Sequence, residues 1–186
     1  GHAWFASDPS SISDQYLTTA APVSVTAWTT LSFWHDYKTE SSYDGGVAEY
    51  SSDGGATWLD LDSQMVTNGY SGTLSSSYNN PIGGRSAFTG DSGGYIQTVA
   101  NLGALTGQSV DFRLRMATDS SVNSTGWYFD DISIGTEVSL SSTVQSSGGV
   151  SETTTLVTTV APGPTNSDPV LAINAVLSVA EAASAI

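Results

Sequence analysis

The stretch LSFWHDYKTESSYDGGVAEYSSDGGATW, residues 31–58, decides the fold class. Its first part, within residues 30–37, alternates apolar and polar side chains, which is the period of a half-buried β-strand. A second β-type run covers residues 47–51. The Asp-Gly-Gly at 53–55 supplies the positive φ angles of a tight turn before a third run, residues 57–61. The stretch therefore predicts one strand followed by a β-hairpin.

Three further β-type runs lie outward from this stretch, at residues 85–89, 110–116 and 126–134. Long connections rich in Ser, Asn and Gly separate them, and no segment keeps a 3.6-residue apolar period for three turns. Short strands with polar connections predict an all-β fold, an antiparallel jelly-roll β-sandwich.

The composition excludes several classes of function. The chain has 186 residues, with 18 acidic and only 4 basic side chains and a net charge of −14. Four basic residues cannot build a basic footprint for nucleic acid. The absence of cysteine removes disulfides, thiol nucleophiles and Cys-ligated zinc, and two histidines are too few for a zinc peptidase.

The aromatic residues define the predicted domain boundary, because all 18 of them lie at or before Phe129. We predict a jelly-roll module over 1–137, a Ser/Thr/Pro-rich linker over 138–164 and a tail over 165–186. The tail resembles the first strands of cadherin-like or immunoglobulin-like repeats, and the alternatives are a disordered tail and an alanine-favoured helix. The sequence has no run of 18 or more apolar residues, so we do not expect it to insert into a membrane. We expect the chain to be a piece of a longer protein.

Four segments together carry a resemblance to a known family. They are residues 31–58, IGGRSAFTGDSGGY at 82–95, VDFRLRMATDSS at 110–121 and GWYFDDISIG at 126–135. In this order they resemble the MAM-like jelly-roll module of secreted bacterial metallopeptidases of the immune inhibitor A and fungalysin types. The resemblance implies a non-catalytic accessory module, secreted or at the cell surface. It would position a parent peptidase on a protein or matrix substrate. We expect a monomer that contacts adjacent domains of its parent protein.

Acidic residues in the loops indicate a site for a hard cation. Glu40 and Asp44 flank a short connection, Asp8 and Asp14 lie in the opening loop, and Asp130-Asp131 lies in the closing strand. Calcium takes six to eight oxygen ligands and needs no nitrogen or sulfur. The alternative is that these acids are solvated loop caps and Asx turns.

The closing strand adds an argument from burial. Of two adjacent aspartates in a strand, one shares the side of Tyr128, Ile132 and Ile134, which we expect to face inward. A carboxylate on an inward face must be paired or metal-bound. The family resemblance implies calcium near Glu40, Asp44 and the Asp130-Asp131 pair. The predicted Ca²⁺ ligands are Glu40, Asp44, Asp130, Asp131 and Asp8.

Two catalytic alternatives are weak. Residues 90–94 spell GDSGG, as in the nucleophile loop of trypsin-like proteases, but Ser92 would need a base and the available one is His35. His35 is instead expected to be a hydrogen-bonded structural histidine. Glycoside hydrolysis needs two paired carboxylates, and Glu49 has no partner in a tight strand motif. Arg113 and Arg115 share a strand face and are expected to pair with acids on a neighbouring strand.

A carbohydrate-binding module is the alternative function. Aromatic side chains in or near loops could stack on sugar rings, although core packing is the default expectation for each of them. The candidates are Trp4, Trp28, Trp58, Tyr70, Tyr78 and Tyr95.

Overall fold

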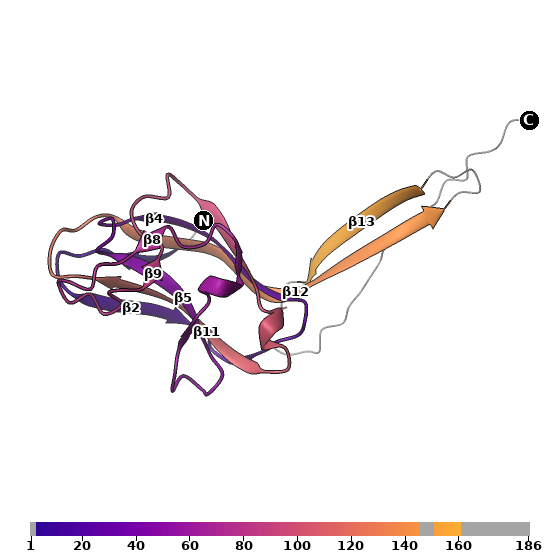
Figure 1. Ribbon diagram of the computed structural model, residues 1–186, viewed down its shortest axis with the longest axis horizontal. Coiled ribbons are helices and arrows are strands. Elements are labelled where there is room, and N and C mark those ends of the chain that lie inside the picture. Colours follow the sequence, from indigo (N-terminus) through magenta and orange to yellow (C-terminus); the bar gives the residue numbers. More distant parts are fainter. Residues whose placement is uncertain (1–2, 146–150, 161–186) are drawn as a thin grey trace, which may run out of the picture.

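The computed structural model describes residues 3–145 and 151–160, and it is an antiparallel β-sandwich (Figure 1). The first sheet has the order β1 (Trp4–Ser7), β12 (Gly126–Gln145), β4 (Thr29–Lys38), β10 (Ile96–Asn101) and β7 (Met65–Thr67), with β13 (Ser151–Val160) paired to β12. The second has the order β2 (Ser13–Thr18), β11 (Ser109–Thr118), β5 (Gly45–Ser51) and β6 (Leu59–Asp60), with β3 (Val23–Ser24) paired to β11. The predicted all-β antiparallel sandwich is confirmed.

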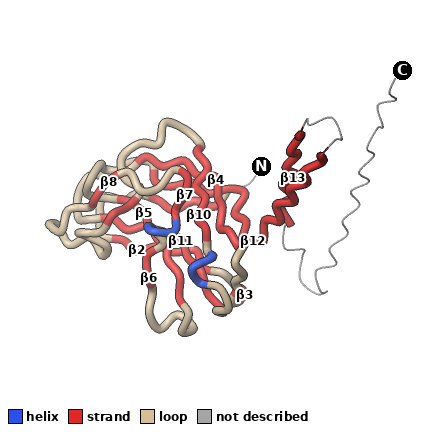
Figure 2. Tube along the Cα trace, turned by 45° about the vertical axis from the view of Figure 1, so that its right-hand side comes forward, coloured by secondary structure: helices blue, strands red, loops and turns tan. Residues whose placement is uncertain are grey.

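Short elements complete the fold. A small ladder joins β8 (Gly72–Thr73) to β9 (Ser86–Ala87). The two helical turns drawn in Figure 2 are 3₁₀ segments, Asp62–Gln64 and Gly103–Leu105. The predicted hairpin is present: β5 pairs with β6, and Gly54 and Gly55 take positive φ angles of 71° and 87° in the turn between them.

The core lies between the two sheets and follows the alternation of the strands. In β4, every second side chain from Thr29 to Tyr37 is buried, and β11 contributes Val110, Phe112, Leu114 and Met116 in the same way. Trp127 is the largest side chain with no exposed surface, and its ring packs against Phe88 and Phe129. The apolar side chains named here belong to one hydrophobic cluster between the two sheets. A second, smaller cluster consists of Val47, Leu74, Ile82, Ala87 and Ala117.

The strand β12 differs from the sequence prediction in which side chains face inward. Trp127 and Phe129 are buried, whereas Tyr128 faces outward against Phe5. A bulge between Asp130 and Ser133 then changes the alternation, so that Ile134 packs on the core although Tyr128 does not. The expectation that Tyr128, Ile132 and Ile134 share an inward face was wrong, because a bulge cannot be recognised from alternation alone.

The structure also differs from the predicted linker over 138–164. The strand β12 continues past residue 137 to Gln145, and β13 pairs with it from Ser151 to Val160. Figure 1 shows this hairpin extending from one end of the sandwich. The segment is rich in Thr and Val, whose β-branched side chains favour strands. Its Ser/Thr-rich composition had instead suggested a linker. The predicted tail, 165–186, lies outside the described residues.

Candidate metal centre

Four acidic residues lie at strand termini on the end of the sandwich opposite to β13. Asp8 follows β1, Glu40 lies two residues after β4, Asp44 directly precedes β5, and Asp119 directly follows β11. The first residue of β12 pairs with the last residues of β1 and β4, and the first residue of β5 pairs near the end of β11. The strand register therefore brings these four positions, far apart in sequence, to one end of both sheets.

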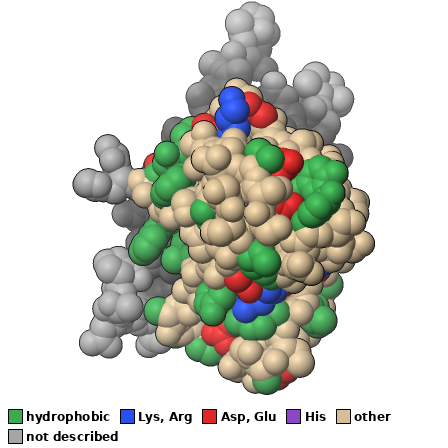
Figure 3. All heavy atoms as spheres, turned by 90° about the vertical axis from the view of Figure 1, so that its left-hand side faces the viewer, with side chains coloured by type: hydrophobic (Ala, Val, Ile, Leu, Met, Phe, Trp, Pro, Cys, Tyr) green, Lys and Arg blue, Asp and Glu red, His purple; other side chains and the backbone are tan. Residues whose placement is uncertain are grey.

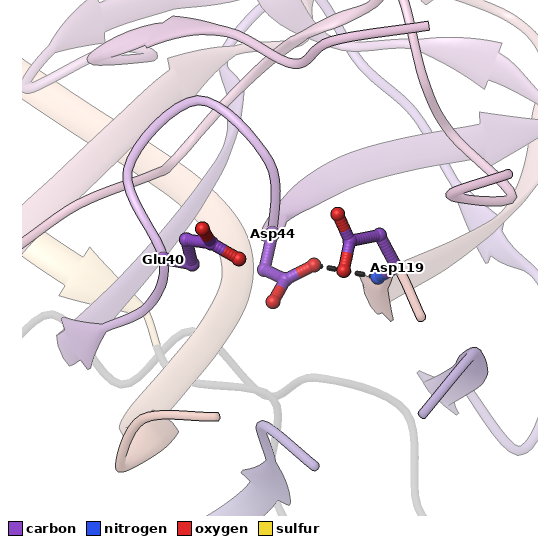
Figure 4. A group of neighbouring side chains, drawn as sticks. All are labelled: Glu40, Asp44 and Asp119. Carbon is purple, nitrogen blue, oxygen red and sulfur yellow. Dashed lines mark hydrogen bonds between the residues drawn. The ribbon is translucent and has the colours of Figure 1, made fainter. Parts of the chain in front are cut away.

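The carboxylates of Glu40, Asp44 and Asp119 point toward one another (Figure 4). One oxygen from each lies within 4.8 Å of the others. The backbone N–H of Asp119 donates a 2.6 Å hydrogen bond to Oδ1 of Asp44, which ties the end of β11 to the start of β5. The Asp8 carboxyl interacts with that of Asp44, so it belongs to the same group. We call Asp8, Glu40, Asp44 and Asp119 the acidic cluster.

Backbone hydrogen bonds hold the turn that carries Glu40 and Asp44. The N–H of Asp44 donates to the carbonyl of Glu40 at 3.0 Å, which closes the turn. The carbonyl of Asp44 accepts from Oγ1 of Thr39 at 3.0 Å and from Oγ1 of Thr89 at 2.7 Å. Both threonines are buried. The protein therefore fixes the main chain beside the carboxylates, while Oδ2 of Asp44 and Oε2 of Glu40 have no hydrogen-bond partner.

Five buried carboxylate oxygens in this cluster accept no hydrogen bond. They are Oδ1 and Oδ2 of Asp8, Oε2 of Glu40, Oδ2 of Asp44 and Oδ2 of Asp119. Among the described residues, every buried side-chain nitrogen or oxygen that lacks a partner belongs to the acidic cluster. A buried polar atom without a partner costs about 1–3 kcal/mol, and more if it is charged. Such a concentration marks these residues as a group that could hold a metal ion.

No cation of the described chain neutralises the cluster. The ion pairs among residues 3–145 use the three arginines and Lys38, and none of them involves Asp8, Glu40, Asp44 or Asp119. Burial raises the pKa of Asp44 from 3.8 to about 7, and burial likewise raises the pKa of Asp8. The pKa of Glu40 is also raised, first by desolvation and then by the negative charges of Asp119 and Asp44. Either protonation or a bound cation would relieve the cost of burying these carboxylates together.

We expect this proton uptake to appear in the pH dependence of the chelated protein. A folded-state pKa above the unfolded value means that the folded state binds more protons, so stability falls as pH rises from about 4 to about 7. The contribution of His35 to stability instead rises with pH over this range, because burial lowers its pKa to about 3 and the folded state then binds fewer protons than the unfolded state. Thermal melts of the wild type and Asp44→Asn in chelator separate the two effects. The wild type should lose stability relative to Asp44→Asn across this range, and parallel curves would contradict the raised pKa.

The donor set fits calcium. Two oxygens bound to one Ca²⁺ at 2.3–2.6 Å can lie up to about 5 Å apart, which accommodates the 4.8 Å limit found here. Four carboxylates and no nitrogen or sulfur ligand are typical of a hard cation. Magnesium requires shorter bonds and keeps several waters, which suits a cluster of buried carboxylates less well.

The structure brings together three of the five predicted ligands, Glu40, Asp44 and Asp8, and leaves Asp130 and Asp131 apart. Asp130 pairs across the sheet with Trp34, about 13 Å along β12 from its first residue. Asp131 is exposed, with φ at 48°, and its N–H donates to Oδ1 of Asp130. These two aspartates belong to the bulge, so a burial argument based on regular alternation does not apply to them.

Sequence reasoning missed Asp119, although its segment is part of the family resemblance. The residue directly follows β11, as Asp8 follows β1, and an acid at a strand end was the available signal. This signal is informative only if β11 is known to end beside the start of β5. The pairing of β11 with β5 depends on the strand order, which the local sequence does not give. Oδ1 of Asp119 accepts from the Ser121 N–H at 2.8 Å, which leaves Oδ2 for the cluster.

The structural role predicted for His35 is confirmed. The ring has no exposed surface, its Nδ1 accepts from the Trp127 indole N–H at 2.9 Å, and its Nε2 lies 2.9 Å from Oγ1 of Thr98. Ser92 lies on the other side of the sheet, where its hydroxyl donates to Oδ1 of Asp36 at 2.8 Å. His35 therefore cannot act as a base for Ser92.

The arginines also pair as predicted. Arg113 and Arg85 both bind Glu49, which is 1% exposed, and Arg115 binds Asp14. In the view of Figure 3, which looks at one end of the sandwich, the Lys and Arg side chains lie beside Asp and Glu side chains. These pairs use three of the chain's four basic residues for structure.

The fold and the acidic cluster define an antiparallel β-sandwich with a group of carboxylates at one end that could hold a metal ion. No protein-family model matches the chain, and no curated protein matches it. Among the described residues, none forms a helix of the length and apolar character that crossing a bilayer requires. The functional argument therefore depends on the geometry of the site.

Proposed function

We propose that this chain is a calcium-stabilised, non-catalytic binding module of a secreted or cell-surface multidomain protein. The observation that carries the proposal is the set of five buried carboxylate oxygens without partners at one end of the sandwich. Calcium there would link the ends of β1, β4 and β11 to the start of β5. A chain without cysteine would thus gain a cross-link between its two sheets.

The proposed location follows from calcium chemistry. Calcium sites of extracellular modules bind with dissociation constants of about 10⁻⁴–10⁻³ M, a range that suits calcium-rich surroundings. The resemblance to accessory modules of secreted bacterial metallopeptidases supports the same location and a parent enzyme. In that role the module positions an attached domain on a protein or matrix substrate.

Thermal melting tests the proposed metal. A ligand that binds only the folded state adds about 2.7 kcal/mol at 100 times its dissociation constant. Calcium should therefore raise the melting temperature markedly over that in chelator, and an equal concentration of magnesium should raise it much less. Superimposable melting curves in calcium and in chelator would overturn the proposal.

A further inference from the structure

The outward side of the first sheet carries two rows of side chains that cross neighbouring strands. The register aligns Phe5 of β1 with Tyr128 of β12 and Tyr128 with Asp36 of β4. Tyr95 directly precedes β10, whose Ile96 pairs with His35, so Tyr95 lies beside Asp36. The second row consists of Asp130, Trp34 and Gln97. We call the rings of Phe5, Tyr128, Trp34 and Tyr95 the aromatic face.

The rings of the aromatic face are open to solvent. Phe5 is 50% exposed, Tyr95 48% and Trp34 40%, while Tyr128 stacks on Phe5 with 4.5 Å between ring centroids. The core expectation for Tyr95 was therefore wrong, and it was also wrong for Trp4, Trp28 and Tyr78, whose side chains are exposed. Exposed aromatic rings gathered on one side of a sheet mark a candidate interaction site, because exposing such rings to water is unfavourable.

Hydrogen-bonding groups lie between and beside these rings. A hollow of about 210 Å³ adjoins Tyr128 and is lined by Asp36, Lys38, Asp91 and Thr125 among others. Lys38 pairs with Asp91 at 3.4 Å across its edge. The hollow is smaller than the pockets of about 300–1,000 Å³ that enclose whole small molecules, so it would take a polar group of a ligand that lies on the rings.

The chemistry of this surface selects neutral oligosaccharide as its occupant. The faces of aromatic rings carry partial negative charge and attract the C–H bonds of a sugar ring. The carboxylates of Asp36, Asp91 and Asp130 can accept hydrogen bonds from sugar hydroxyls. These three acids outnumber Lys38, so the surface repels polysaccharides that carry carboxylate or sulfate groups.

Among the described residues, the second sheet presents fewer outward rings than the first, although Tyr16 is 63% exposed. Its outward rings, Tyr16 and Trp58, already lie over the Arg113 guanidinium, at 5.5 and 4.1 Å. Arg113 is in turn bound to Glu49. The aromatic face suits a sugar better than it suits a protein partner, because a protein interface would also use exposed aliphatic side chains. The large aliphatic side chains that are exposed in the described chain lie outside its two rows: Ile12, Leu59, Val66, Val122 and Ile132.

We propose that the aromatic face binds a neutral polysaccharide, with Trp34 and Tyr95 as stacking platforms and Asp36 as a hydrogen-bond acceptor. The proposal gives a ligand class to the binding module proposed above, and it rests on that binding role. The site does not share a side chain with the acidic cluster. The outcome for the sugar and the outcome for the metal are therefore separate.

Affinity gel electrophoresis in constant calcium tests the proposal. The probes are soluble neutral β-glucans, mannans, xylans and chitin oligosaccharides, with alginate and a sulfated glycan as anionic counterparts. We expect retardation by at least one neutral polymer and by neither anionic one. Trp34→Ala and Tyr95→Ala should each weaken binding at least tenfold without changing the melting temperature.

Trp28→Ala is the matched control, because Trp28 is 70% exposed but lies outside the two rows. Its binding should equal that of the wild type. The proposal is overturned if no neutral polymer binds the wild type, if only anionic polymers bind, or if Trp34→Ala and Tyr95→Ala bind as tightly as Trp28→Ala. The calcium concentration is the same for every protein in this experiment. A failure to bind sugar is therefore distinguishable from a failure of calcium to raise the melting temperature.

Discussion

The effect of replacing Asp119 by Asn on thermal stability is expected to change sign between chelator and calcium. In chelator, the variant should melt higher than the wild type, because one of four mutually repelling buried carboxylates has become neutral. In calcium, it should melt lower, because a charged ligand has been lost. The Asn amide oxygen can still accept from Ser121, so the loop retains its hydrogen bond.

The size of this effect follows from the stability that calcium adds when it binds only the folded state. The wild type should gain about 2.7 kcal/mol at a calcium concentration of about 100 times its dissociation constant, and Asp119→Asn should gain little. Differential scanning calorimetry in both conditions measures the effect. Asp130→Asn is the control, because Asp130 lies away from the cluster. Equal calcium gains in wild type and Asp119→Asn would show that Asp119 is not a ligand.

Gly46→Ala is expected to cost about 3 kcal/mol, the upper end for added atoms in a well-packed core. A Cβ at Gly46 would lie 1.8 Å from Cζ3 of Trp127. The indole cannot move aside easily, because it donates to His35 and packs between Phe88 and Phe129. Urea unfolding measures the loss in free energy.

Gly69→Ala serves as the control for this substitution. A Cβ there would meet Met65 at 3.7 Å, an ordinary contact, and its effect should be small. If Gly46→Ala were as stable as the wild type, the packing of Trp127 described here would be wrong. The Asp-Gly-Gly of residues 44–46 thus combines a carboxylate of the acidic cluster with a glycine that leaves room for Trp127.

The sequence predicted the strands whose alternation is regular. Residues 30–37 and 110–116 correspond to β4 and β11, since each buries one face and exposes the other. The edge strand β2 was missed. Its inward positions are only half-buried, so a strong apolar pattern is absent there. The bulge in β12 was also missed, because its extra residue leaves no mark on composition.

The candidate site was predictable only in part, for a topological reason. Glu40 and Asp44 are close in sequence, and one turn brings them together. Asp8 and Asp119 join them because β1 and β11 end on the same side of the sandwich, and strand order cannot be derived from local pattern. The same limit applies to the aromatic face, whose rings come from three strands and the start of a fourth.

Isothermal titration with calcium tests the central claim most directly. The full chain, freed of metal by chelation and dialysis, should bind one Ca²⁺ at the acidic cluster. Asp130→Asn should bind it as the wild type does, whereas Asp119→Asn should lose most of the affinity. Failure of the wild type to bind calcium, or loss of binding in Asp130→Asn with full binding in Asp119→Asn, would contradict the account.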